Sequence, residues 1–429
     1  MLVKYVELQI IQNGMNGEGI AKADGKVFFV DGAIAGDVVI AEIVKENKNF
    51  TIAKLKEIVK SSQYRSEPIC PYYGKCGGCN LQHIDYKKQL EIKTQNIQNL
   101  FDKTKLNFKV NDCISSQQEY SYRNKITMYL GQDNRLSFYQ KGSKCLVNIN
   151  NCYLVNEKFN DFIAKMNVFF EKNKEFNYFV VRGMAVRLIN DIFIINLILN
   201  KKVVLTKLEN WLKLNKIKYS LYYCVNNKNN LPTYPCIFVG GEKNVFVREF
   251  DIKYGIEPMS FLQVNNSVKT NIYQIICNKV STCNNVLDAY SGAGLLSAIL
   301  AKKCKHVFAV EIDKSACLAC EQLCKLNGIK NLECICGDCS LEVPKIVSTN
   351  MLDCVILDPA RKGVDDKTLE SVKNSLAKDI IYLSCNPATL TRDLKILCED
   401  SEYQITYVQP FDMFPQTSEV ETLVFLSKK

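Results

Sequence analysis

Cys385 lies in the segment IIYLSCNPATL, at the end of a short apolar run and two residues before Pro387. The run predicts a buried strand, and the proline turns the chain after it, so the thiol is placed at the edge of a sheet. A thiolate is a strong nucleophile, but an ordinary cysteine has a pKa of about 8.5, so a reactive site has to favour the charged form. Arg361 is the candidate positive neighbour, because neither of the two histidines is close in sequence. A small core cysteine is the alternative interpretation.

Four acidic residues each follow a short apolar run in the same part of the chain. Runs that are apolar at every position predict strands buried on both faces, and their alternation with helical segments predicts a doubly wound parallel sheet. The carboxyl ends of such strands meet at one edge, where ligands bind. The four acids are Asp288 in VLDAYSGAG, Glu311 in VFAVEID, Asp338 in GDCS and Asp358 in ILDPAR. Each alone is more often a cap or turn residue, but their order predicts one binding site.

The glycine turn after Asp288 indicates the kind of ligand. Gly292 and Gly294 let the backbone pass close to a bound molecule. Glu311, at the end of the next strand, can accept both hydroxyl groups of a ribose. No third glycine follows three residues after Gly294, as a dinucleotide fingerprint would require. We therefore expect the adenosyl group of S-adenosylmethionine at this turn, with Asp338 near the adenine.

A methyl donor beside a reactive thiol suggests methylation of a carbon that is a poor nucleophile, such as C5 of uracil. Addition of a thiolate to C6 lets C5 accept a methyl group, and a base must then remove the C5 proton. The segment FPQTSEVETLVFL offers Glu419 and Glu421. In a strand that runs through both, their side chains share one face, so alternation alone does not separate them.

These motifs resemble the RNA uracil-C5 methyltransferases, most closely the iron–sulfur bacterial enzymes that act on 23S ribosomal RNA. The resemblance extends over nearly the whole chain and is carried by CPYYGKCGGCNLQH, YSYRNK, SFLQVN, DAYSGAG, VEID, LDPAR, LSCNP and FPQTSEVE. It implies that Cys385 is the nucleophile and Glu421 the base. It also places a set of residues around S-adenosylmethionine: Gln263, Tyr290, Glu311, Asp338 and Asp358.

The resemblance further implies that Arg123 and Phe261 lie near the RNA strand. Three positions depart from the family pattern. Glu419 stands where the family usually has histidine, DPAR replaces the common DPPR, and Leu295 stands where some relatives have asparagine. These departures affect fine contacts and leave each chemical role filled.

Three closely spaced cysteines predict a metal centre. Cys70, Cys76 and Cys79 form a C-x5-C-x2-C pattern in a basic region. Thiolates at this spacing hold zinc or an iron–sulfur cluster, and either needs a fourth ligand. Cys152 and Cys145 are the candidates for it. The resemblance implies a 4Fe–4S cluster on Cys70, Cys76, Cys79 and Cys152.

The elements that position these residues suggest three domains. The pattern of residues 1–58 predicts short strands with tight turns. The segments GEGIA, KVFFV and AIAGD resemble the TRAM domain, an OB-like RNA-binding β-barrel. Residues 59–255 mix helical and strand patterns, which predicts a central α+β iron–sulfur domain. Residues 256–429 predict the α/β Rossmann-like methyltransferase domain that uses S-adenosylmethionine.

Charge and composition favour an RNA partner. The net charge is +10, and from Ile256 onward 18 Lys and Arg face 21 Asp and Glu, which leaves 37 against 24 before it. A basic N-terminal part suggests a polyanionic partner, because neutralised phosphates release counterions. With 47% hydrophobic residues and no signal-peptide pattern, we expect a cytoplasmic monomer without membrane or obligate protein partners. Its 20 cysteines are then expected to be reduced.

Three other functions remain open at this point. A transfer RNA could replace ribosomal RNA as the substrate of the same reaction. A base methyltransferase acting on an exocyclic amine would need no nucleophilic Cys385. A non-catalytic RNA-binding factor would tolerate the loss of Cys385 and Glu421 together.

Overall fold

The C-terminal part of the chain folds into a seven-stranded sheet. In this computed structural model, which describes residues 4–226 and 228–429, the first three residues of the expected barrel lie outside the described residues. The strands of this sheet are β16 (Asn285–Ala289), β17 (His306–Glu311), β18 (Leu332–Cys336), β19 (Cys354–Leu357), β20 (Asp379–Ser384), β21 (Tyr403–Phe411) and β22 (Glu421–Lys428).

The strand order of this sheet is β18-β17-β16-β19-β20-β22-β21, and the pairs from β18 to β20 are parallel. β22 runs antiparallel to both of its neighbours. The order reverses between β16 and β19, which is the switch point where doubly wound sheets bind ligands. The expected α/β architecture is therefore confirmed, and each of the five apolar runs predicted as strands forms one.

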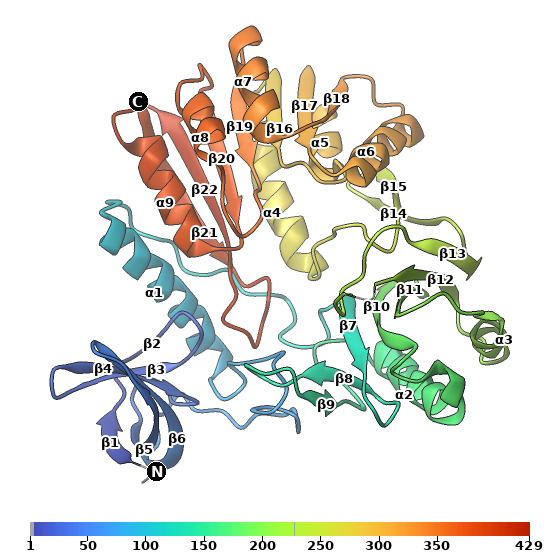
Figure 1. The fold of residues 1–429 in the computed structure, drawn as a ribbon. Coiled ribbons are helices and arrows are strands. Elements are labelled where there is room, and N and C mark those ends of the chain that lie inside the picture. Colours follow the sequence, from blue (N-terminus) through green and yellow to red (C-terminus); the bar gives the residue numbers. More distant parts are fainter. Residues whose placement is uncertain (1–3, 227) are drawn as a thin grey trace.

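Helices cover both faces of the sheet (Figure 1). They are α4 (Asn266–Lys279), α5 (Leu295–Ala301), α6 (Lys314–Asn327), α7 (Cys339–Thr349), α8 (Asp366–Lys373) and α9 (Pro387–Cys398). One apolar core joins the sheet to α4, α5 and α6, and a second joins it to α7, α8 and α9. Burial on both faces explains why the strands lack the apolar–polar alternation of a half-exposed sheet.

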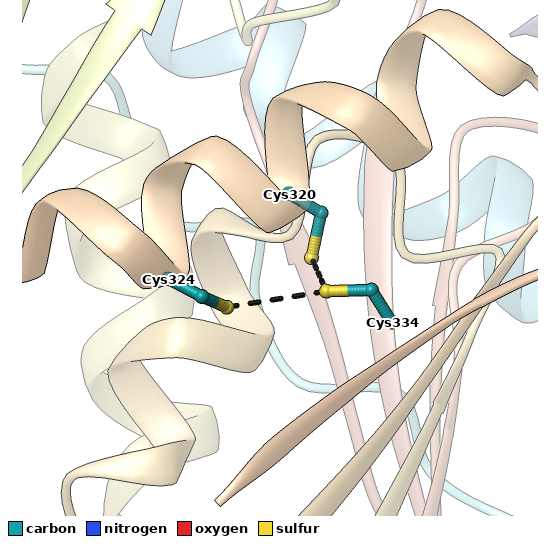
Figure 2. A group of neighbouring side chains, drawn as sticks. All are labelled: Cys320, Cys324 and Cys334. Atoms are coloured by element: carbon teal, nitrogen blue, oxygen red, sulfur yellow. Dashed lines mark hydrogen bonds between the residues drawn. The ribbon is translucent and has the colours of Figure 1, made fainter. Parts of the chain in front are cut away.

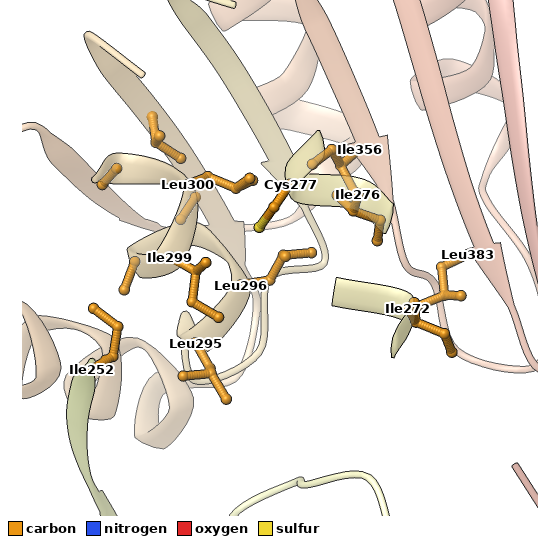
Figure 3. Packing of buried hydrophobic residues seen from close by; sticks show 14 of the residues in the cluster. Ile252, Ile272, Ile276, Cys277, Leu295, Leu296, Ile299, Leu300, Ile356 and Leu383 are labelled. Carbon is orange, nitrogen blue, oxygen red and sulfur yellow. The ribbon is translucent and has the colours of Figure 1, made fainter. Parts of the chain in front are cut away.

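The first core contains an unusual group of cysteines. Cys320 and Cys324 from α6 face Cys334 from β18 (Figure 2). Elsewhere this core is aliphatic, with Ile272 and Ile276 of α4 packed near Leu296 of α5 (Figure 3). Close packing of such side chains holds α4 and α5 against the strands whose ends carry the predicted site.

A second seven-stranded sheet lies in the middle of the chain, with order β13-β12-β11-β10-β7-β8-β9. Its strands are β7 (Lys125–Leu130), β8 (Leu136–Tyr139), β9 (Leu146–Asn148), β10 (Val181–Ile189), β11 (Ile192–Leu199), β12 (Tyr219–Val225) and β13 (Ile237–Gly241). The apolar segments KITMYL, VRGMAVRLI and IFIINLIL form β7, β10 and β11, in line with the strand patterns expected in this part of the chain. The helices α2 (Glu157–Lys172) and α3 (Thr206–Leu214) share one core with the sheet, and a short 3₁₀ turn (Lys174–Phe176) follows α2.

The N-terminal strands form a third, six-stranded sheet with order β1-β5-β6-β4-β3-β2. They are β1 (Tyr5–Gln9), β2 (Gln12–Asn13), β3 (Gly19–Ala23), β4 (Lys26–Asp31), β5 (Val38–Glu46) and β6 (Phe50–Lys60). The sheet curls around a small apolar core that includes Leu8, Val30 and Val39 (Figure 1).

Two elements that precede residue 256 pack with the C-terminal sheet. The hairpin of β14 (Val245–Glu249) and β15 (Ile252–Ile256) places Val245, Ile252 and Ile256 in the first core, so the expected boundary after residue 255 falls inside a strand. The helix α1 (Tyr86–Thr104) places Ile97 and Phe101 in the second core beside α9. Among the described residues, no helix is both long enough and apolar enough to span a membrane.

Candidate active site

Cys385 directly follows β20, and Glu421 is the first residue of β22. Ser384 pairs with Thr422 in the antiparallel ladder, so the thiol and the carboxyl group lie across from each other. Glu421 is only 2% exposed. Burial raises the pKa of its carboxyl group well above the usual value, and the nearby Asp358 adds to the increase, while Arg361 opposes it.

The pKa of the Cys385 thiol is also raised. It reaches about 11, mainly through burial and then through the charge of Glu421, while Arg361 lowers it. Arg361 is held beside the thiol because the Asn386 side-chain amide donates to the Arg361 carbonyl at 2.8 Å. The expected positive neighbour of Cys385 is therefore present, although its effect is smaller than that of burial.

The structure separates the two acids that alternation left equivalent. The expectation that one strand carries both Glu419 and Glu421 is wrong, because β22 begins only at Glu421. Just before it, Asn80 accepts a hydrogen bond from the backbone N–H of Ser418 at 2.8 Å, so the backbone of this segment is bonded outside the strand ladder. Glu419 is partly exposed and accepts a hydrogen bond from Arg361 at 2.8 Å. Only Glu421 is buried beside Cys385.

The predicted ligand turn follows β16 at the sheet's carboxyl edge. Tyr290, Gly292 and Gly294 all have positive φ angles, and Gly294 begins α5. A Cβ atom at Gly294 would lie 2.3 Å from the Cys320 sulfur, so glycine is required there. Glu311, at the end of β17, accepts the Gly292 N–H at 2.9 Å and the Asp313 N–H at 2.8 Å. This carboxylate thus lies against the turn, where a ribose of the ligand was expected.

The other three acids differ in their surroundings. Asp288 is buried and accepts the Ser297 hydroxyl hydrogen, and burial raises its pKa to about 7. Burial also raises the pKa of Asp358 to about 7, with a smaller contribution from Asp288. Asp338 accepts the Ser340 N–H at 2.9 Å as the N-cap of α7, so its side chain has a local structural partner. Of these three acids, Asp358 is the one whose charge acts on both Cys385 and Glu421.

Two tyrosines complete the surroundings of this edge. Tyr273 on α4 was not singled out from the sequence, because its helix carries no motif. Burial raises the pKa of its phenol, and the charges of Asp358, Asp288 and Glu421 act in the same direction. Tyr290 donates to Asp365, the N-cap of α8, at 3.2 Å.

The motifs SFLQVN and YSYRNK lie side by side. Arg123 and Asn265 form a β-bridge, and the Asn124 side chain donates to the Gln263 carbonyl at 3.2 Å. Phe261 is 72% exposed and projects from this paired segment into solvent. The structure therefore places Arg123, Gln263 and Phe261 in two neighbouring segments.

Three cations meet beneath this segment. Lys125 of β7 pairs directly with Arg187 of β10, and the charge of Arg123 also acts on Lys125. The pKa of Lys125 is lowered to about 8, mainly by burial and also by the two guanidinium groups. Arg187 donates to the Ser260 carbonyl at 3.1 Å, next to Phe261. Like charges opposed across a strand pair are destabilising, so this arrangement suits an anionic partner.

The four cysteines predicted to hold a metal centre line one cavity of about 450 Å³. They are Cys70, Cys76, Cys79 and Cys152, and Arg123 also lines the cavity. Burial raises the pKa of Cys79 to about 12 and that of Cys152 to about 11. The alternative fourth ligand, Cys145, is exposed and is not among the lining residues. Four converging thiols are a donor set that suits zinc or an iron–sulfur cluster.

Several known proteins are similar to this chain in sequence or in fold. An uncharacterized RNA methyltransferase of Clostridium acetobutylicum is 34% identical, over 98% of this chain and 96% of its own length. One from Caldanaerobacter subterraneus is 32% identical, over 99% and 98%. The crystal structure of the Pyrococcus abyssi tRNA (uracil-54, C5)-methyltransferase with S-adenosyl-L-homocysteine has the same fold, with a TM-score of 0.81, 24% identity, and coverage of 98% and 100%.

The sequence model of one family matches most of the chain. The match extends over residues 85–429, which include Cys385, Glu421, the glycine turn and the paired motifs around Phe261. It begins after the N-terminal sheet and after Cys70, Cys76 and Cys79. The expected family is confirmed: the chain belongs to the tRNA (uracil-5-)-methyltransferase family.

Proposed function

We propose that this protein transfers the methyl group of S-adenosylmethionine to C5 of a specific uridine in 23S ribosomal RNA. The observation that carries the proposal is the pairing of Cys385 with the buried Glu421 at the carboxyl edge of the sheet. The glycine turn and Glu311 lie at the ends of β16 and β17, on the same edge. A nucleophile, a base and a nucleoside site at one edge meet the needs of uracil C5 methylation.

Cys385 and Glu421 serve two successive steps of the reaction, the addition to C6 and the removal of the C5 proton. The Cys385 thiolate adds to C6 of the uracil, and the electron pair displaced toward C5 attacks the methyl carbon, whose bond to the sulfonium sulfur breaks and leaves S-adenosylhomocysteine. Glu421 as carboxylate then takes the C5 proton, the C5–C6 double bond re-forms, and the thiolate leaves. Glu421 lies opposite the thiol in the ladder, so one base can serve the carbon next to the attacked one.

Both groups must become anionic in the complex. In the free protein, burial keeps the pKa values of Cys385 and Glu421 high. The sulfonium of S-adenosylmethionine carries a positive charge, and an opposite charge nearby lowers the pKa of a thiol or carboxyl group. Binding of the methyl donor therefore favours the reactive forms, and Arg361 acts in the same direction.

An RNA substrate is supported by the paired motif segment. Phe261 offers an exposed ring on which a base can stack, and Arg123 and Lys125 supply positive charge beneath it. A uridine inside a fold must leave its stack to reach Cys385, and single-stranded loops open most easily. We assign residues 1–58 as a TRAM barrel that adds RNA contacts, residues 59–255 as the central domain and residues 256–429 as the catalytic domain, to whose core the hairpin of β14 and β15 adds side chains.

The four-cysteine cavity is proposed to hold a 4Fe–4S cluster on Cys70, Cys76, Cys79 and Cys152. The fit rests on the four thiols that line one cavity, because a 4Fe–4S cluster is held by four cysteine thiolates. When bound, the cluster cross-links two chain segments beside Arg123. Anaerobically purified protein should then be brown and contain iron; a colourless protein with stoichiometric zinc contradicts this assignment.

Ribosomal RNA is favoured over transfer RNA by the resemblance of the N-terminal strands and the cysteine motif to the ribosomal enzymes. Transfer RNA is the second candidate, because the Pyrococcus protein of the same fold is named for that substrate. The test incubates the protein with labelled S-adenosylmethionine and separate unmodified 23S and transfer RNAs, followed by mass spectrometry of the digests. 5-Methyluridine in 23S RNA supports the proposal. Label only in transfer RNA would show that transfer RNA is the substrate of the same reaction, and no label in either RNA contradicts the activity.

A further inference from the structure

Five cysteines lie along one helix–strand contact, away from the proposed cluster and from Cys385. On α6 the spacing of Cys317, Cys320 and Cys324 is i, i+3 and i+7, which puts them on one face of the helix. On β18, Cys334 and Cys336 alternate, so they share one face of the strand. The two faces meet, because α6 packs against β18.

The inner three sulfur atoms converge. Cys320 Sγ lies 2.7 Å from Cys334 Sγ, and Cys324 Sγ lies 3.9 Å from the same atom (Figure 2). All three lie within 4.8 Å of one another, and among the described residues this is the one group of metal-ligating side chains so close. Around one tetrahedral ion, sulfur–metal bonds of about 2.3 Å place the sulfur atoms about 3.8 Å apart. The Cys324–Cys334 separation already fits that value, and Cys320 needs to withdraw by about 1 Å.

The surroundings favour a soft ion. Cys320 and Cys324 are buried in the aliphatic first core, with Leu295 and Leu323 as fellow members. Thiolate donors in such a shell select copper(I) or zinc over hard cations.

We propose that Cys320, Cys324 and Cys334 form a trithiolate site for a thiophilic d¹⁰ ion, zinc(II) or copper(I). Such an ion fixes α6 to β18 directly behind the turn that begins α5, since Cys320 touches the backbone at Gly294. The alternative is that the three cysteines are ordinary small core residues, or that Cys320 and Cys334 form a disulfide.

The test measures metal stoichiometry on the reduced, full-length protein in competition with a chromogenic chelator, separately for zinc(II) and copper(I). The wild type should hold one equivalent more of one of these ions than the variant Cys324→Ser/Cys334→Ser. The control Cys236→Ser/Cys398→Ser, which removes two partly exposed cysteines outside the three-cysteine group, should match the wild type. The ion for which the two proteins differ is the ion that the site binds.

A second measurement guards against a variant that does not fold. Adding the ion to wild type should raise its unfolding temperature, because a ligand that binds only the native state stabilises it. The same rise should appear in a Cys70→Ser/Cys76→Ser protein, whose predicted cluster site is removed. Equal stoichiometry in wild type and Cys324→Ser/Cys334→Ser overturns the proposal. So does an intact mass about 2 Da low that reductant restores, since that result shows the disulfide.

Discussion

Cys385 and Glu421 face each other across the β20–β22 ladder, one residue beyond the Ser384–Thr422 pair. The ladder is antiparallel, so the end of one strand meets the start of the other at the same edge. A change in register by one residue would turn the Glu421 side chain to the opposite face. The register of β22 therefore decides which acid can act on a uracil bound to the thiol.

The charge of the methyl donor should control the reactivity of Cys385. The raised pKa of about 11 predicts slow alkylation by iodoacetamide at neutral pH, with a rate that rises as pH approaches that value. S-adenosylmethionine should lower the midpoint of this pH profile, because its sulfonium favours the thiolate. S-adenosylhomocysteine is the matched control, since it fills the same site without the positive charge. Peptide mass spectrometry of Cys385 measures the rate; equal midpoints with both ligands would contradict the proposed charge effect.

The buried Asp288 should make the ligand-free protein less stable at high pH. Its pKa is raised in the folded state, so the native protein binds a proton there that the unfolded chain has already lost. The stability from this group is complete below about pH 4 and is lost as pH rises through about 7. The shift from 3.8 to about 7 corresponds to about 4 kcal/mol at most.

The variant Asp288→Asn removes this titration. Between pH 5 and pH 8, its unfolding temperature should fall less than that of the wild type, as measured by calorimetry without ligand. Asp400→Asn, at an exposed turn, serves as the control and should follow the wild type. Parallel curves for wild type and Asp288→Asn would show that this carboxyl group does not titrate as described.

Phe261 should contribute to RNA affinity through stacking. Replacing an aromatic residue that stacks on a base costs about 1–3 kcal/mol, or roughly 5- to 150-fold in Kd. Phe261→Ala should weaken binding of the substrate RNA within this range and leave the affinity for S-adenosylmethionine unchanged. Phe179→Ala is a matched control, because Phe179 is 67% exposed on the central domain outside the paired motifs. Equal RNA affinities of the two variants, measured by fluorescence anisotropy, would remove Phe261 from the RNA interface.

Removing one partner of the buried ion pair of Lys93 and Asp412 should strongly destabilise the protein. Lys93 Nζ lies 2.5 Å from Asp412 Oδ1, and the side chains are 1% and 0% exposed. Removing one partner leaves a buried charge alone, which costs about 3–5 kcal/mol. Lys93→Met should therefore lower the unfolding temperature strongly, and Lys93→Met/Asp412→Leu should recover much of the loss. Lys4→Met, in the exposed pair with Glu46, should change little; an equal loss in both single variants would contradict this assignment.

The sequence predicts the local parts of this site and not the long-range ones. Apolar runs identify β16, β17, β19 and β20, because strands buried on both faces need no polar positions. Asp288, Glu311, Asp358 and Cys385 are correctly placed near strand ends for the same reason. Glu421 could not be separated from Glu419, because alternation does not show where β22 begins, and the segment before β22 has a hydrogen-bond partner, Asn80, that lies 338 residues away.

The same limit applies to packing between distant segments. The periodicity of α1 predicts a helix, but its contact with the C-terminal part depends on Lys93 and Asp412, which are 319 residues apart. The hairpin of β14 and β15 likewise joins the first core through side chains whose partners follow later in the chain. Cys320 and Cys334 showed no ligand spacing in the sequence, since their sulfur atoms meet only when α6 packs on β18.

The most direct test of the account is to trap the intermediate on Cys385. Without a base to remove the C5 proton, the reaction should stop after methyl transfer, with the RNA still bound through C6. Glu421→Gln incubated with substrate RNA and S-adenosylmethionine should give a covalent protein–RNA species on denaturing gels, with turnover about 10²–10⁴-fold lower. Mass spectrometry should locate a methylated uridine on Cys385, and Cys385→Ser/Glu421→Gln should give no adduct. Full turnover by Glu421→Gln without an adduct would contradict the assignment of base and nucleophile.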